Sequence, residues 1–201
     1  MAERPGPEPP LGLSQLSDLD GVSIRQKIND FTGNKYVVLS PTGDVVMYAR
    51  EDTGAIGQIL GGHSRPFHID IFDTQDRKVF NLRRPYTFGP DKMEVFVCGQ
   101  LASVVRQEMT FLKPVLNIND AGDKAVLRVK GPVSMTGVCD FDVLNLDKKK
   151  VGVISKRWCG LRDLNSNDDF FQIRFPAQLD VKYKTAVIGT CFLIDFLYYE
   201  N

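Results

Sequence analysis

The stretch Lys182–Asn201, KYKTAVIGTCFLIDFLYYEN, is an apolar run at the C-terminal end of the chain, and its placement decides the fold. It shows no alternation of apolar and polar residues, and its length favours a helix over a strand. Asp180 is suited to cap such a helix, which we predict over about residues 181–199. Gly189 weakens the helix by about 1 kcal/mol. A helix that is apolar on every side has to be surrounded by protein or by lipid.

Two properties of this run favour burial in protein over insertion into a membrane. About fifteen apolar residues span roughly 22 Å as a helix, which is less than the ~30 Å hydrocarbon layer. Asp195 lies within the run, and a carboxylate at that depth costs about 2.5 to 3.5 kcal/mol on an insertion scale. A core position requires a partner for Asp195 on the surrounding wall, such as an arginine, a lysine or a hydroxyl group. A membrane-spanning helix with Asp195 as its polar group is the alternative.

Most of the remaining chain consists of short apolar segments that short turns join in pairs. The pairs are KYVVL with VVMYA, PFHIDIF with KVFNL, MEVFV with LASVV, PVLNI with AVLRV, and DFDVLNL with VGVIS, followed by FFQIRF. Apolar residues alternate along them, as at Phe67, Ile69 and Ile71, which is the period of a half-buried strand. Short turns imply antiparallel neighbours, so we predict an all-β fold that closes into a barrel or splits into a sandwich. A barrel of about a dozen strands is too wide for its own side chains to fill, and the C-terminal helix would fill it.

The composition is that of an ordinary globular protein without net charge. Of 201 residues, 43% are hydrophobic, and 25 lysines and arginines balance 25 aspartates and glutamates. Such a chain is not drawn as a whole toward nucleic acid or anionic lipid, and the lack of a basic stripe with interleaved aromatic residues makes DNA an improbable partner. We expect one domain over residues 13–201, preceded by a short Pro-rich disordered tail over residues 1–12.

The cysteines indicate a reducing, intracellular setting. Cys98, Cys139, Cys159 and Cys191 are far apart and form no CxxC pair. The N-terminal segment lacks the apolar stretch of a secretory signal. We therefore expect free thiols and no metal site built from cysteines.

Several stretches, in order along the chain, resemble the phospholipid scramblase family. They are SRPFHIDIFD (Ser64–Asp73), LRRP (Leu82–Pro85), KGPV (Lys130–Val133), VGVISKRWCG (Val151–Gly160) and IRFPAQLDVKYKTAVIGTCFLIDFLYYE (Ile173–Glu200). The resemblance implies a closed antiparallel barrel of about twelve strands (tubby-like) enclosing a hydrophobic C-terminal α-helix. It also implies ATP-independent, Ca²⁺-stimulated movement of phospholipids between the bilayer leaflets. The family acts at the cytoplasmic face of the plasma membrane, and some members also enter the nucleus.

The resemblance further implies a Ca²⁺ site in NDDFFQIRFPAQ, residues 167–178. Asn167, Asp168 and Asp169 can supply oxygen ligands, Phe171 offers a backbone carbonyl, and Gln178 stands where the family has a terminal aspartate. The loop glycine is missing, and charge is lost at both ends. We expect weak Ca²⁺ binding, at best about millimolar. An acidic turn followed by a buried strand would account for the same residues.

Other family features are reduced in this chain. No cysteine occurs between Met1 and Val97, so the palmitoylated cysteine cluster of the family is absent after LRRP. GVISKRWCGL, residues 152–161, matches a nuclear-import stretch in which Lys156 and Arg157 would carry recognition. Two charges at a strand end are also typical of a solvated edge. The Pro-rich region with its PPxY-type motifs is cut down to RPGPEPP, which leaves no basis for WW or SH3 partners.

Two hypotheses of function follow from these observations. The first is phospholipid scrambling, which needs a polar path for headgroups rather than covalent catalysis, so no catalytic residue is assigned. Asp195 would then be the intramembrane polar group, and an oligomer could form the path.

The second hypothesis is a soluble tubby-like module in the cytosol or nucleus, which binds phosphoinositides or protein partners. Its candidates for headgroup binding are basic residues that would have to share one face of the barrel. They are Arg83, Arg84, Lys148, Lys149 and Lys150, together with Lys156 and Arg157. A nuclear regulatory role is a weaker third option.

Overall fold

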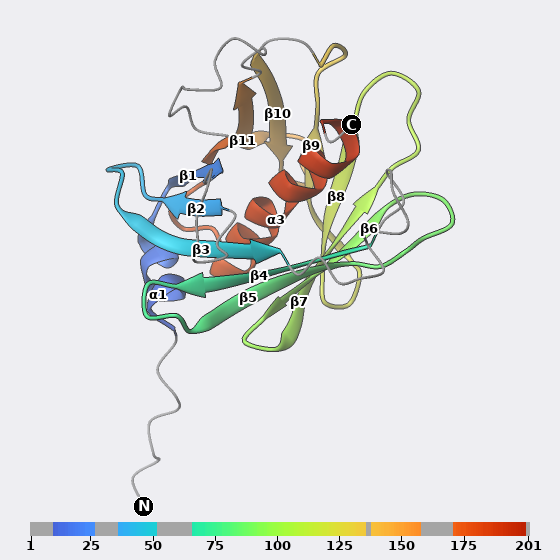
Figure 1. The fold of residues 1–201 in the computed structure, drawn as a ribbon. Coiled ribbons are helices and arrows are strands. Elements are labelled where there is room, and N and C mark those ends of the chain that lie inside the picture. Colours follow the sequence, from blue (N-terminus) through green and yellow to red (C-terminus); the bar gives the residue numbers. More distant parts are fainter. Residues whose placement is uncertain (1–9, 27–35, 52–65, 136–137, 158–170, 200–201) are drawn as a thin grey trace, which may run out of the picture.

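The structure is a computed structural model that describes residues 10–26, 36–51, 66–135, 138–157 and 171–199. Within these ranges, twelve strands form one closed antiparallel barrel, and a long helix lies inside it (Figure 1). The predicted barrel of about twelve strands around a hydrophobic C-terminal helix is therefore confirmed.

The helices are α1 (Leu11–Asp18) and α3 (Val181–Tyr198). The strands are β1 (Gly21–Gln26), β2 (Tyr36–Leu39), β3 (Val45–Glu51), β4 (Phe67–Asp73), β5 (Lys78–Arg84), β6 (Lys92–Val97), β7 (Gln100–Gln107), β8 (Val115–Asp120), β9 (Ala125–Lys130), β10 (Val138–Leu144), β11 (Lys150–Arg157) and β12 (Phe171–Arg174).

Each strand pairs with its neighbours in sequence, and β1 pairs with β12 to close the barrel, with Val22 opposite Ile173. The hairpins expected from the sequence are all present, from β2–β3 to β10–β11. Strand β1 and helix α1, whose first turn begins at Leu11, were not expected from the sequence.

The antiparallel order gives the barrel two different ends (Figure 1). The short turns within the five hairpins lie at one end, which we call the short-turn end. The connections β5–β6, β7–β8 and β9–β10 lie at the opposite end, which we call the long-loop end. The other three connections from that end, residues 27–35, 52–65 and 158–170, lie outside the described residues. Helix α3 follows β12, so it starts at the short-turn end and finishes at the long-loop end.

Helix α3 is capped and buried as its sequence predicts. The Asp180 side chain accepts a hydrogen bond of 3.0 Å from the backbone N–H of Lys182, which satisfies one free donor of the first turn. Every residue from Lys184 to Phe196 is buried. Among the described residues, no helix combines the length and the apolar character needed to cross a membrane.

Gly189 lies where α3 packs tightly against the barrel wall. A Cβ atom at this position would lie 2.7 Å from Leu82 Cδ2 and 3.0 Å from Met93 Cε. A larger residue would therefore require the side chains of Leu82 on β5 and Met93 on β6 to shift. Glycine at this position lowers the stability of the helix itself but allows close packing of α3 against the wall.

The interior is filled jointly by wall residues and by α3. The alternating residues Phe67, Ile69 and Ile71 of β4 all point inward and are buried, as predicted. Aromatic contacts join the wall to the helix, with ring centroids of Tyr36 and Phe192 separated by 5.2 Å. The helix therefore replaces the void that a barrel of this width would otherwise contain.

Candidate functional site

Asp195, the carboxylate within the apolar run, lies inside the barrel and pairs with Lys156 of β11. Lys156 Nζ donates a hydrogen bond to Asp195 Oδ1, and the two residues are only 6% and 7% exposed. Strand side chains alternate between faces, and Lys156 lies on the same face as the buried Ile154. The wall thus supplies the partner that a core position of Asp195 requires, and no bilayer is needed to account for this carboxylate.

Aromatic rings and neutral groups surround this ion pair. Lys156 Nζ lies 3.8 Å from the ring centroid of Tyr199 and 5.0 Å from that of Phe171. Burial raises the pKa of the Tyr199 phenol and raises the pKa of the Cys191 thiol well above its usual value. Both groups are therefore protonated near neutral pH.

A second polar group from the wall contacts the end of α3. The guanidinium of Arg84, which is 3% exposed, donates to Asp91 Oδ1 and lies 4.3 Å from the ring centroid of Phe196. The side chain of Gln107 joins the same region, because its Nε2 donates to Tyr198 Oη at 3.2 Å and its Oε1 accepts from the Asp91 N–H at 3.2 Å. The last turn of α3 is thus tied by side chains to the bases of two long loops.

At the opposite end, α3 is held by the fully buried Lys184. Its Nζ lies within 2.7–3.2 Å of four backbone carbonyl oxygens. No pattern in the sequence predicts this shell of carbonyls. These carbonyls belong to Leu16, Ser17, Leu19 and Ala177. Two of them are in the last turn of α1, where the helix dipole favours a cation. Burial nevertheless lowers the pKa of Lys184.

The long-loop end also exposes large apolar side chains. Phe111 and Phe88 are 107% and 94% exposed, and Met109 and Leu112 are 79% and 77% exposed. They lie in the connections β7–β8 and β5–β6. Val133, in the connection β9–β10, is exposed as well. Sequence patterns missed these residues, because an apolar residue in a loop gives no periodic signal.

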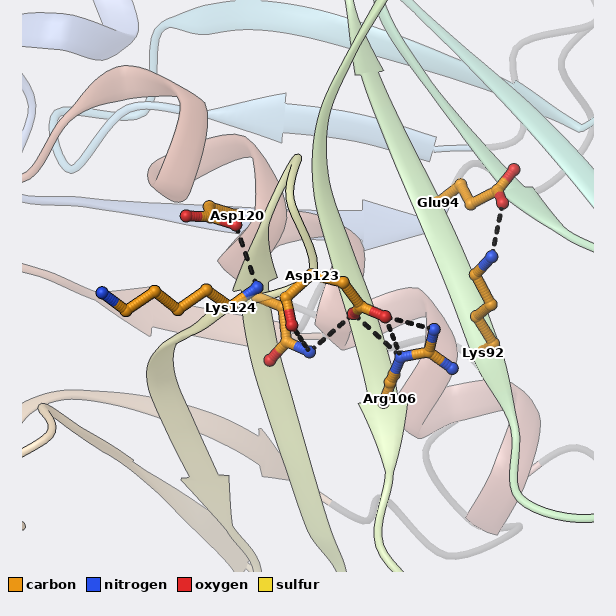
Figure 2. A network of polar contacts seen from close by, with 7 residues as sticks. Lys92, Glu94, Arg106, Asp120, Asp123 and Lys124 are labelled. Atoms are coloured by element: carbon orange, nitrogen blue, oxygen red, sulfur yellow. Dashed lines mark hydrogen bonds and ion pairs between the residues drawn. The ribbon is translucent and has the colours of Figure 1, made fainter.

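The outer wall of the barrel carries a polar network across β6, β7 and the β8–β9 turn (Figure 2). Arg106 donates to both carboxylate oxygens of Asp123 at 2.5–3.0 Å, and Asn119 Nδ2 donates to Asp123 Oδ1 at 2.8 Å. The hydrogen bonds from Arg106 are the main reason that the pKa of Asp123 falls to about 2. Lys92 and Glu94 form a further pair at 2.7 Å. Two pairs on this wall, Arg106 with Asp123 and Lys92 with Glu94, thus match their charges locally.

The predicted headgroup residues do not share one face. Arg83 is exposed on β5 near the long-loop end, whereas the adjacent Arg84 points inward and is buried. Lys148, Lys149 and Lys150 are exposed at the β10–β11 turn, at the short-turn end. The prediction of Arg84 as a surface contact is wrong, because alternation along β5 turns it into the interior.

The import-like pair is likewise split by alternation. Lys156 is buried in the pair with Asp195, so the interpretation of these charges as a solvated strand edge is wrong for this residue. Arg157 ends β11, and its side chain lies outside the described residues. The alternation of Gly152, Ile154 and Lys156 along VGVISKR could have revealed this placement from the sequence.

Of the predicted Ca²⁺ segment, the structure describes residues 171–178, which form a strand followed by a turn. Phe171 starts β12 with a buried side chain, and Gln178 lies in the exposed turn beyond that strand. Phe171 and Gln178 are thus separated by the rest of strand β12 and do not sit in one continuous loop. Asn167, Asp168 and Asp169 lie outside the described residues, and the described part of the chain holds no group of three His, Cys, Asp or Glu side chains suited to a metal.

Comparison with known proteins places this architecture in a family. A family model described as Scramblase matches residues 1–201. The chain belongs to the scramblase family. The resemblance inferred from the sequence is therefore confirmed.

Curated relatives extend over nearly the whole chain. The chain is 36% identical to phospholipid scramblase 2 of Bos taurus over 98% of its own length and 75% of that protein. It is 35% identical to phospholipid scramblase 1 of Homo sapiens, again over 98% of this chain and 70% of the relative.

A solved structure supports the fold independently. An X-ray structure of an Arabidopsis thaliana protein matches with a TM-score of 0.54 and covers 87% of this chain and 90% of that one. The identity is 15%, so the match shows the tubby-like fold and nothing of function.

Proposed function

We propose that this scramblase-family protein moves phospholipids between the leaflets of a bilayer without ATP, at the cytoplasmic face of the plasma membrane. The similarity to proteins named phospholipid scramblase, over 98% of the chain, carries this proposal. The sequence contains no phosphate-binding glycine loop, which agrees with independence from ATP. No covalent chemistry is assigned, because lipid transfer requires a polar path rather than a reaction.

The position of α3 restricts where such a path can lie. The helix fills the barrel, so headgroups do not pass through the interior while α3 occupies it. A path through the barrel requires α3 to withdraw, which would expose Asp195 and Lys156. A path along the outside requires an oligomer.

Ca²⁺ stimulation is the finer part of the proposal. The side-chain ligands would be Asn167, Asp168 and Asp169, since Phe171 starts strand β12 and Gln178 lies in the turn beyond it. Vesicles that contain the purified protein and a dithionite-quenchable lipid test both parts in the absence of ATP. We expect more quenching than in protein-free vesicles, and a further rise with Ca²⁺ over a chelator. Quenching equal to that of protein-free vesicles overturns transport, and an equal response with and without Ca²⁺ overturns stimulation.

A second candidate is a binding module that holds phosphoinositide headgroups or a protein partner without transporting lipid, in the cytosol or nucleus. The enclosure of α3, with Lys184 and Asp195 both paired inside, favours a barrel that stays closed. A carbonate wash of membranes separates the two candidates, because a peripheral barrel is released and an inserted protein is retained. A nuclear role is better tested with Arg157→Ala alone, since a change at Lys156 also removes the buried ion pair.

A further inference from the structure

The three described loops of the long-loop end share an unusual chemistry. The connections 85–91 and 108–114 and residues 131–135 contain three charged side chains. Asp91 and Glu108, at the bases of their loops, pair with Arg84 and Arg128. The third is Lys113. Their apolar side chains point into solvent, and a folded monomer rarely exposes so many together. The residues concerned are Tyr86, Phe88, Met109, Phe111, Leu112 and Val133, which we call the apolar loop surface.

Backbone contacts hold these loops in one frame. The Gln107 N–H donates to the Asp91 carbonyl at 2.8 Å, which joins the bases of the first two loops. The Gly131 N–H donates to the Pro114 carbonyl at 2.8 Å, which joins the second loop to the third. A Cβ atom on Gly131 would lie 3.0 Å from Pro114 Cγ, so this junction is closely packed. The apolar side chains are therefore presented together from a fixed base.

We propose that the apolar loop surface docks on a phospholipid bilayer and inserts its side chains among the lipids. This inference deepens the proposed function and rests on it for the class of partner, a phospholipid. Bulky apolar and aromatic side chains beside a basic residue are the chemistry of proteins that lie in the membrane interface. Lys113 lies toward the loop tips, away from the paired Asp91 and Glu108 at the loop bases, and matches an anionic headgroup layer.

The shape of the surface favours lipid over a protein partner. Phe88 and Phe111 stand on separate loop tips and are almost fully exposed, whereas anchors of protein interfaces fill complementary pockets. A bilayer adapts to separate projections and needs no matching shape. Docking in this orientation also brings the last turn of α3, which ends at the same end, toward the lipid. Lys148, Lys149 and Lys150 then face away from the membrane.

Flotation of the purified full chain with vesicles tests the proposal. The vesicles contain phosphatidylcholine with or without phosphatidylserine, and the matched variants are Leu112→Ser and Leu146→Ser. Both leucines are exposed, at 77% and 64%, but Leu146 lies at the short-turn end. We expect Leu112→Ser to weaken binding about tenfold, because each bulky apolar side chain contributes on the order of tenfold to transfer from water. Leu146→Ser should bind like the wild type.

Two further variants sharpen the result. The triple variant Phe88→Ser/Phe111→Ser/Leu112→Ser should lose about a hundredfold or more in binding, by the same transfer argument. Its urea midpoint should stay unchanged, since these side chains are exposed in the folded state. Lys113→Gln should weaken binding about fivefold on vesicles with phosphatidylserine and not at all on phosphatidylcholine alone.

Three results would overturn the proposal. The first is a wild type that binds neither kind of vesicle, which would leave a protein partner for this surface. The second is a triple variant that binds as well as the wild type. The third is an equal loss of binding from Leu112→Ser and Leu146→Ser. If the wild type docks through its loops but moves no labelled lipid between leaflets in the dithionite assay, the docking proposal stands and the transport proposal is overturned. The two proposals therefore fail separately.

Discussion

The two ends of helix α3 are held in the barrel by different chemistry. At the short-turn end, Lys184 binds backbone carbonyls of α1 and of the turn before α3. At the long-loop end, Asp195 binds the side chain of Lys156, and Phe196 lies against the guanidinium of Arg84. Backbone acceptors cannot be titrated or removed by substitution, whereas side-chain partners can.

The difference between backbone and side-chain partners indicates at which end the barrel can open. The short-turn end joins the first and last elements of the chain through one ammonium group, so releasing α3 there also releases α1. The long-loop end depends on side-chain pairs next to the apolar loop surface. We expect α3 to loosen first at the long-loop end when conditions weaken those pairs.

The largest effect should come from Lys184→Met, which removes the buried ammonium and leaves its carbonyl oxygens without that donor. We expect the free energy of unfolding, measured in urea, to fall by about 3 kcal/mol or more, because unsatisfied buried acceptors cost about 1–3 kcal/mol each. Lys182→Met is the matched control, since the Lys182 side chain is 44% exposed and pairs with Asp180 at 3.5 Å. Equal losses from both variants would show that the carbonyl shell does not hold the helix.

A smaller but still large effect is expected at the other end. Asp195→Asn leaves Lys156 buried without its charged partner and should cost about 3 kcal/mol. The double variant Lys156→Met/Asp195→Leu should recover most of that loss, because a well-packed apolar pair can replace a buried ion pair. Hydrogen exchange should show faster opening at the end of α3 in Asp195→Asn than at its start. Uniform protection along α3 would contradict the distinction between its ends.

The smallest effect should come from the exposed pair on the outer wall. The pKa of Asp123 is about 2 when folded, below its usual value of 3.8, so this carboxylate stabilises the protein above about pH 4 and loses that effect as the pH falls through 2. Asp123→Asn should therefore cost at most about 1 kcal/mol at pH 7, since the pair with Arg106 is two-fifths exposed and screened by solvent. The cost should vanish near pH 2 in acid-dependent urea unfolding. A cost that persists at that pH would mean that Asp123 acts through something other than its charge.

The sequence was most informative where a pattern is local. The hairpins follow from period-two alternation and short turns, and α3 follows from length, apolar content and the cap at Asp180. Helix α1 and strand β1 were missed because each is short and gains its stability from tertiary contacts. Leu13 and Leu16 of α1, for example, are buried only because the rest of the barrel covers them.

Paired charges in sequence were the main source of error in the candidate site. Arg83 and Arg84 are neighbours in sequence but lie on opposite faces of β5, since one is exposed and the other buried. Arg83 and Arg84 would form one basic patch only on a common face, and the alternation of side chains along β5 separates them. The same correction applies to Lys156, whose burial follows from its register with Ile154.

The sequence by itself determined that this chain is an antiparallel β protein with one apolar helix whose Asp195 needed a partner. It also indicated the scramblase family, because the C-terminal stretch Ile173–Glu200 is specific to that family. Only the tertiary structure decided that the partner is Lys156, that Lys184 joins α3 to α1, and that apolar loop tips gather at one end. The physical reason is that these contacts join residues far apart in the chain, and closure of the barrel sets which of them meet.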